Sequence, residues 1–185
     1  GPKSNFLILH GYTGHANTNF IPWLKSELES KGFEVQAPEL PNTDNPKESE
    51  QVGYVIDNFK IDERTILIGH SLGGVVAMKV LEKIDRPVAG LVLVAPAVEP
   101  EFRTGELRSF WDTFNIKYDY EKLKSLTNFR TILSDIHEEE RAPYLKFLAS
   151  KISASLRETV AVEEHFCAEK EPFILESFTP SISVF

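Results

Sequence analysis

The stretch Ile66-Leu67-Ile68-Gly69-His70-Ser71-Leu72-Gly73-Gly74 joins an apolar run to a G-x-S-x-G pentad, and residues 75–81 continue with an apolar, helix-like pattern. This context predicts a strand, a tight turn and a helix. Small residues two positions before and after a serine allow the strand and the helix to approach closely, so the serine occupies a strained turn with its hydroxyl exposed. A serine exposed in this way is a candidate nucleophile.

Apolar runs alternate with helical patterns on both sides of this unit. We expect strands at residues 6–9, 33–37, 65–68, 90–95, 129–133 and 159–162. We expect helices at residues 20–31, 50–59, 75–84, 146–156 and 172–178. Strands that alternate with helices form βαβ units, which predicts an α/β fold with an about six-stranded parallel sheet and helices on both faces. Residues 99–127 are mostly polar with scattered aromatics and are expected to form a short cap segment.

Bulk composition favours one ordinary globular domain over residues 1–185, with 42% hydrophobic and 26% charged residues. Gly1-Pro2 is typical of a cleaved expression tag, and residues 179–185 are expected to form a loose tail.

No segment approaches the about 18 apolar residues of a membrane span. The net charge of −8 opposes nucleic-acid binding. Cys167 is the single cysteine, which together with the lack of a leader favours a cytoplasmic location.

Three candidate catalytic groups follow the ends of predicted strands, where sites form in open parallel sheets. Ser71 follows one strand, an acidic group follows the strand that ends near Leu133, and His165 follows the last strand. The order nucleophile, acid, histidine is the chain order of α/β-hydrolase triads, and it differs from the orders of chymotrypsin and subtilisin. The sequence therefore predicts a compact α/β-hydrolase fold.

Each group has a chemical role in this scheme. His165 would take the proton of Ser71 on attack and return it to the leaving group, because a serine hydroxyl is a poor nucleophile at neutral pH. A carboxylate would orient the imidazole and stabilise the imidazolium. The backbone amides of Leu72 and Tyr12 would form the oxyanion hole that stabilises the developing negative charge on the substrate.

Further motifs outside the pentad form a more specific pattern. They are Phe6 to Tyr12 with His10-Gly11, the run Phe20-Ile21-Pro22-Trp23-Leu24-Lys25 with Leu28, the loop Glu39-Leu40-Pro41-Asn42 with Asp44-Asn45-Pro46, and His165-Phe166. Together with the pentad they resemble small serine hydrolases of the retinoblastoma-binding-protein-9 and YdeN type, over about residues 5–178. The resemblance implies a minimal α/β-hydrolase without the large lid of lipases. It also implies that Ser71 and His165 are catalytic and that small acyl esters are hydrolysed.

The acid loop departs from this family. The family pattern resembles Ser-Asp-Asn-Asp-Pro, whereas this chain has Ser134-Asp135-Ile136-His137-Glu138-Glu139-Glu140-Arg141-Ala142-Pro143. Alignment on the strand end places His137 or Glu138 at the acid position, and alignment on the proline places Glu139 there. We favour Glu138 and then Asp135, because glutamate can serve as the triad acid. The glutamate run also fits a solvated helix start, so the acid is left open between the two.

These features predict a serine hydrolase that cleaves small carboxylic esters or thioesters through an acyl-enzyme. The altered acid loop motivates the alternative of an inactive pseudo-hydrolase that binds a ligand or a protein. No cofactor is expected, and no metal, because His15, His70 and His137 do not have the spacing of a ligand cluster. The expected partner is a small-molecule substrate, and a protein partner is not identified by the sequence.

Overall fold

Six parallel strands form one sheet in the computed structural model, which describes residues 3–105 and 107–182. The strands are β1 (Asn5–Leu9), β2 (Glu34–Gln36), β3 (Thr65–His70), β4 (Val88–Val94), β5 (Thr127–Asp135) and β6 (Ser155–Thr159). Their order across the sheet is β2-β1-β3-β4-β5-β6, and each neighbouring pair is parallel. This sheet confirms the predicted α/β fold with an about six-stranded parallel sheet.

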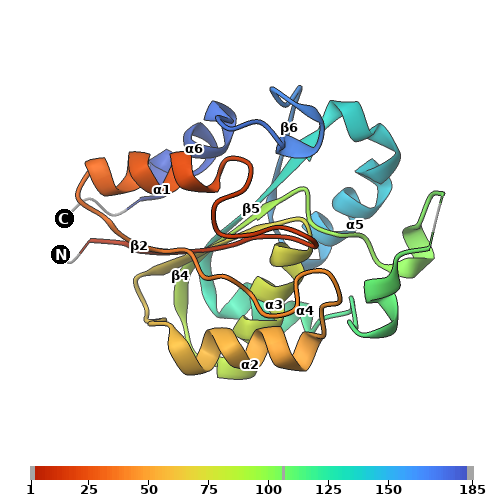
Figure 1. Cartoon of the computed structure of the whole chain (residues 1–185), viewed down its shortest axis with the longest axis horizontal. Helices are drawn as coiled ribbons and strands as arrows, with labels where there is room; N and C mark the ends of the chain where they lie inside the picture. Colours follow the sequence, from red (N-terminus) through yellow and green to blue (C-terminus); the bar gives the residue numbers. More distant parts are fainter. Residues whose placement is uncertain (1–2, 106, 183–185) are drawn as a thin grey trace.

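Helices cover both faces of this sheet (Figure 1). The α-helices are α1 (Ile21–Ser30), α2 (Glu48–Asn58), α3 (Leu72–Ile84), α4 (Tyr120–Ser125), α5 (Ala142–Ile152) and α6 (Pro172–Phe178). Short 3₁₀ helices are η1 (Pro100–Phe102), η2 (Ser109–Asp112), η3 (Ile136–Arg141), η4 (Glu164–Phe166) and η5 (Thr179–Ser181). The helices α1 and α6 lie on one face, and α2, α3 and α4 lie on the other.

Alternate side chains of the central strands enter two separate cores, because successive residues of a strand point to opposite faces. In β1, Leu7 and Leu9 belong to the core with α2, α3 and α5, whereas Phe6 and Ile8 belong to the core with α1 and α6. All four side chains are buried. Burial on both faces explains why the central strands appear in the sequence as unbroken apolar runs.

The predicted strand at residues 159–162 was wrong. The last strand is β6 (Ser155–Thr159), and the side chains of Val160 and Val162 beyond it are 62% and 64% exposed. The helix predicted at 146–156 also begins and ends earlier, since α5 ends at Ile152 and Ser153 takes the left-handed conformation that terminates it (φ 52°). The other predicted helices agree with the structure to within about three residues, and α6 agrees at both ends.

The strand β5 continues to Asp135, two residues beyond its predicted end. This extension brings the candidate acid loop to the carboxyl edge of the sheet, beside the ends of β4 and β6.

The ends of the chain are described in part. The expected tag remnant at residues 1–2 and residues 183–185 of the expected tail lie outside the described residues, whereas η5 occupies 179–181 and Ile182 packs against the core. Within the residues described, no helix has the length and the apolar character needed to cross a membrane.

Candidate active site

Ser71 lies between the end of β3 and the start of α3 with φ 57° and ψ −121°. A positive φ is uncommon for a residue with a side chain, and it persists only where the surrounding structure fixes the backbone. Here the Ser71 amide donates a hydrogen bond to the Val94 carbonyl at 2.9 Å, and the Ser71 carbonyl accepts one from the Ala97 amide at 3.2 Å. The turn is thereby bonded to the chain that follows β4.

The two glycines of the pentad allow this turn because backbone atoms occupy the space of their missing side chains. A Cβ on Gly69 would lie 2.4 Å from the Gly73 carbonyl oxygen. A Cβ on Gly73 would lie 2.2 Å from the Leu9 carbonyl oxygen. Both distances are far below van der Waals contact, so β1, β3 and α3 approach one another at a spacing that only glycine permits.

The backbone of His165 is held from two directions in the loop after β6. Its amide donates to Asp135 Oδ2 at 2.8 Å, and its carbonyl accepts a hydrogen bond from His70 Nε2 at 2.8 Å. His165 itself has φ 66°. Because His70 Nε2 donates, that nitrogen carries the proton. Burial, with a further contribution from the nearby His165, lowers the pKa of His70 to about 3, so its ring stays neutral.

The imidazole of His165 contacts Glu138. Its Nδ1 lies 2.7 Å from Glu138 Oε1, and the Glu138 side chain is buried in η3, where its own backbone is non-helical (φ −117°, ψ 49°). Arg141 Nε forms an ion pair with Glu138 Oε2 at 2.9 Å, but the two groups are not oriented for a hydrogen bond. Burial raises the pKa of Glu138, but the bond from His165 and the charges of His165 and Arg141 outweigh it and hold this pKa below its ordinary value.

Asp135, the second candidate acid, contacts backbone rather than the His165 ring. Besides the His165 amide, its carboxylate accepts hydrogen bonds from the Ala161 amide at 3.0 Å and from the His137 amide at 3.1 Å, and it contacts His137 Nδ1 at 2.8 Å. Burial raises the pKa of Asp135, but these bonds together lower it below its ordinary value. Asp135 therefore ties the end of β5 to the loop after β6.

These positioning roles of His70 and Asp135 are not apparent from the sequence. In the sequence, His70 is the second residue of the pentad and one of three histidines that lack metal-ligand spacing, and Asp135 is the second candidate acid. The remaining candidates of the acid loop lie elsewhere, since Glu139 is exposed and absent from the pocket lining, and His137 bonds to Asp135.

The candidate oxyanion-hole amides lie on two chain segments that approach each other closely. A Cβ on Gly11 would lie 3.1 Å from Ser71 Cβ and 3.6 Å from the Leu72 amide nitrogen. The Leu72 amide begins α3 and has no acceptor within its own helix. His10 fixes the turn before Tyr12, because its Nε2 accepts from the Leu40 amide at 2.9 Å and its Nδ1 donates to the Gly11 carbonyl at 2.9 Å.

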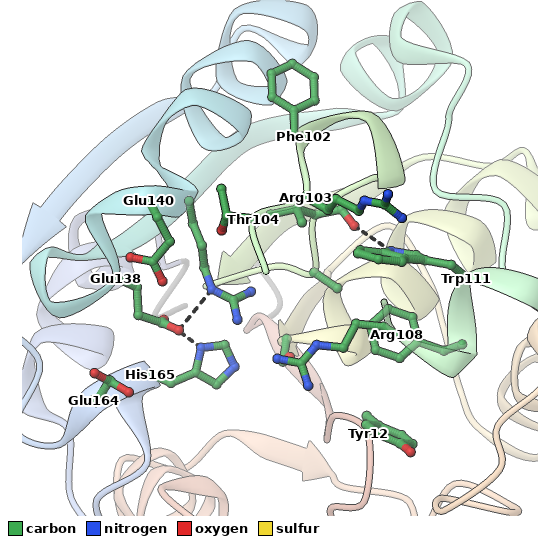
Figure 2. Close-up of a pocket in the computed structure, with 15 residues that line it drawn as sticks. Tyr12, Phe102, Arg103, Thr104, Arg108, Trp111, Glu138, Glu140, Glu164 and His165 are labelled. Carbon is green, nitrogen blue, oxygen red and sulfur yellow. Dashed lines mark hydrogen bonds and ion pairs between the residues drawn. The ribbon is translucent and has the colours of Figure 1, made fainter. Parts of the chain in front are cut away.

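A pocket of about 460 Å³ opens above these groups, and both Ser71 and His165 line it (Figure 2). The loop after β4 and the cap segment form its other side, where the Trp111 indole donates to the Val98 carbonyl at 2.9 Å. The further lining residues are Tyr12, Ala97, Val98, Phe102, Arg103, Thr104, Arg108, Phe110, Trp111, Glu138, Glu140, Arg141 and Glu164. A volume of this size suits a small-molecule ligand.

Neither a metal site nor an activated thiol accompanies this arrangement in the part of the chain that the structure describes. No group of three or more His, Cys, Asp or Glu side chains there has the geometry to hold a metal ion. Cys167 is half-buried, and burial with nearby carboxylates raises the pKa of its thiol to about 11, which keeps the sulfur protonated at neutral pH.

Comparisons with known proteins identify relatives of this chain. The sequence profile of a family described as serine hydrolase matches residues 6–135. The chain is 24% identical over 156 residues to the putative hydrolase YdeN of Bacillus subtilis, covering 82% of this chain and 80% of YdeN. It is 29% identical over 120 residues to the serine hydrolase RBBP9 of Rattus norvegicus, covering 64% of this chain and 58% of RBBP9. The crystal structure of the ydeN gene product matches with a TM-score of 0.83 at 21% identity, covering 96% of this chain and 98% of that chain.

Proposed function

Because the chain belongs to the serine hydrolase family, we propose that it cleaves small carboxylic esters or thioesters through an acyl-enzyme on Ser71, with His165 as general base and Glu138 as the acid. The observation that carries this proposal is the 2.7 Å contact between His165 Nδ1 and Glu138 Oε1 in a pocket that also contains Ser71. The same contact argues against an inactive pseudo-hydrolase, because that alternative was motivated by an acid loop without the usual Asp-Pro.

The proposed reaction begins with proton transfer. His165 keeps its proton on Nδ1, which donates a hydrogen bond to the Glu138 carboxylate, so the lone pair of its Nε2 is available to accept the proton of Ser71. Ser71 Oγ then bonds to the carbonyl carbon, and the carbonyl oxygen becomes an oxyanion near the Leu72 and Tyr12 amides. The imidazolium, stabilised by Glu138, returns the proton to the leaving oxygen or sulfur as the carbon–heteroatom bond breaks.

Hydrolysis of the acyl-enzyme follows the same steps, with water as the nucleophile. His165 takes one proton from the water as its oxygen attacks the acyl carbon, and it returns a proton to Ser71 Oγ as the acid is released. The enzyme is regenerated without any cofactor, since every proton transfer passes through His165.

The test of this proposal is the turnover of 4-nitrophenyl acetate and of a short acyl thioester by the wild-type protein and by Ser71→Ala. We expect wild-type turnover of at least one of these and a loss of kcat/KM on the order of 10³-fold or more in the variant, because the hydroxyl that forms the covalent intermediate is gone. Equal rates in the two folded proteins would show that Ser71 is not the nucleophile.

A further inference from the structure

Two arginines of the cap segment, Arg103 and Arg108, line the same pocket as Ser71. In the described ranges, 3–105 and 107–182, neither guanidinium forms an ion pair or a hydrogen bond. The third arginine of the pocket, Arg141, is instead paired with Glu138. Unpaired cationic groups in the pocket that contains Ser71 are notable in a chain with 28 acidic and 20 basic residues.

Apart from Arg141, which pairs with Glu138 on η3, the positive and negative side chains of the pocket lie on opposite sides. Figure 2 shows the side chain of Arg108 directed into the pocket, toward the side from which His165 projects, while Arg103 extends toward Trp111. The carboxylates of Glu138, Glu140 and Glu164 lie on the far side, on or next to η3 and η4. An anionic group in the pocket would therefore be repelled from the η3 side and attracted to Arg108.

A guanidinium group matches one kind of ligand better than others. It has only donors, arranged as a planar fork that bonds a carboxylate through two parallel hydrogen bonds. A neutral ester offers Arg108 only weaker carbonyl acceptors. Phe110 and Trp111 lie in the same wall, where they can pack against a short apolar linker between the carboxylate and the scissile carbonyl.

We propose that the substrate is an ester or thioester that also carries a carboxylate, which Arg108 binds while the scissile carbonyl lies at Ser71. This inference rests on the proposed function. The carboxylate belongs to either the acyl or the alcohol portion, and both have the same chemistry at Arg108. Arg103, at the rim of the pocket, also attracts the negatively charged substrate. Salt would screen this electrostatic attraction.

Two substrate pairs test this proposal. On the acyl side, mono-(4-nitrophenyl) glutarate is compared with 4-nitrophenyl valerate. On the alcohol side, 4-acetoxybenzoate is compared with phenyl acetate. For each pair the ratio of kcat/KM, charged over neutral ester, is measured for the wild type, Arg108→Gln, Arg108→Lys and Arg86→Gln. Arg86 is an exposed arginine in the turn between α3 and β4 and is absent from the pocket lining, so it controls for loss of a positive charge elsewhere.

We expect the ratio in at least one pair to fall about 10-fold or more in Arg108→Gln, to fall less in Arg108→Lys, and to stay at the wild-type value in Arg86→Gln. High salt should reduce the ratio in the wild type. Intrinsic differences in ester reactivity cancel, because each ratio is compared between proteins.

Failure of this inference differs from failure of the proposed function. Hydrolysis with the same ratio in the wild type and Arg108→Gln, for both pairs, would overturn the carboxylate assignment and leave the hydrolase assignment standing. If the wild type hydrolyses none of the esters, titration calorimetry with glutarate and with 4-hydroxybenzoate decides the matter. Binding that is lost in Arg108→Gln supports the carboxylate site, and no binding to the wild type overturns it.

Discussion

His165 Nδ1 and Glu138 Oε1 lie 2.7 Å apart although 27 positions separate them in the chain. Two features of the acid loop produce this contact. The strand β5 extends to Asp135, which ties the loop after β6 to its own end, and the backbone of η3 departs from helical geometry at Glu138. A glutamate three residues beyond the strand thus reaches the ring of a histidine beyond the next strand.

Glu138→Gln should lower kcat for a turned-over ester by roughly 10²–10⁴-fold, because the neutral amide does not stabilise an imidazolium and can favour the wrong tautomer of His165. The measurement is steady-state kinetics, with thermal unfolding as the check that the variant is folded. Glu139→Gln is the matched control, since this neighbouring side chain is exposed and absent from the pocket lining. Wild-type kcat in Glu138→Gln would remove this residue from the triad.

Asp135→Asn should reduce the free energy of unfolding by about 1–3 kcal/mol, because one buried carboxylate now accepts bonds from the Ala161, His137 and His165 amides and an asparagine cannot satisfy all of them. Urea unfolding followed by circular dichroism measures this change. We expect kcat to fall less than in Glu138→Gln. A stable Asp135→Asn protein with the larger loss of kcat would mean that the two carboxylates have exchanged their assigned roles.

The stability of the protein should fall as the pH is lowered from about 6.5 toward 3, in part through His70. The pKa of this buried ring is lowered from 6.5 to about 3, so in this range the unfolded chain binds a proton that the folded protein excludes. The contribution of His70 to the free energy of unfolding is fully present above about pH 6.5. Below that pH the free energy of unfolding falls by up to about 1.4 kcal/mol for each pH unit.

His70→Gln tests this pH dependence, because the glutamine amide can still donate to the His165 carbonyl but does not titrate. Its free energy of unfolding should vary less between pH 7.5 and 4.5 than that of the wild type. His10, whose pKa burial also lowers, is present in both proteins and cancels in the comparison. The same pH slope in both proteins would show that His70 is not responsible.

Gly73→Ala should destabilise the protein by about 1–3 kcal/mol or prevent folding, because the added Cβ would lie 2.2 Å from the Leu9 carbonyl oxygen, a backbone atom. Gly53→Ala in α2 is the control, since nothing lies within 4 Å of its added Cβ. It should increase the free energy of unfolding by about 0.5–1 kcal/mol, as expected for alanine in place of a helical glycine. Equal stability of the two variants would contradict the close approach of β1 and α3.

The central part of the fold was predictable because its strands are buried on both faces. The apolar run before the pentad marks β3, and the pentad itself requires a close approach of strand and helix. The last strand was misplaced because β6 is an edge strand whose side chains are largely exposed, so it has no apolar run. The strand was predicted at residues 159–162 instead, because residues 160–162 beyond β6 are more apolar.

The choice between the two candidate acids could not be made from the sequence. Both carboxylates follow the same strand, and local sequence does not reveal which one faces a ring and which one faces backbone amides. That distinction depends on how the loop after β6 lies against η3. The role of His70 was hidden for the same reason, because its acceptor is the carbonyl of a residue 95 positions away.

Labelling with a fluorophosphonate probe, followed by intact-mass measurement and peptide mapping, tests the central claim most directly. We predict one probe per folded chain, attached to Ser71, with no labelling of Ser71→Ala or of denatured protein and slower labelling of Glu138→Gln. Two results would contradict the assignment of Ser71 as an activated nucleophile. One is a folded wild-type protein that takes up no probe, and the other is labelling at another residue that is equal in the wild type and in Ser71→Ala.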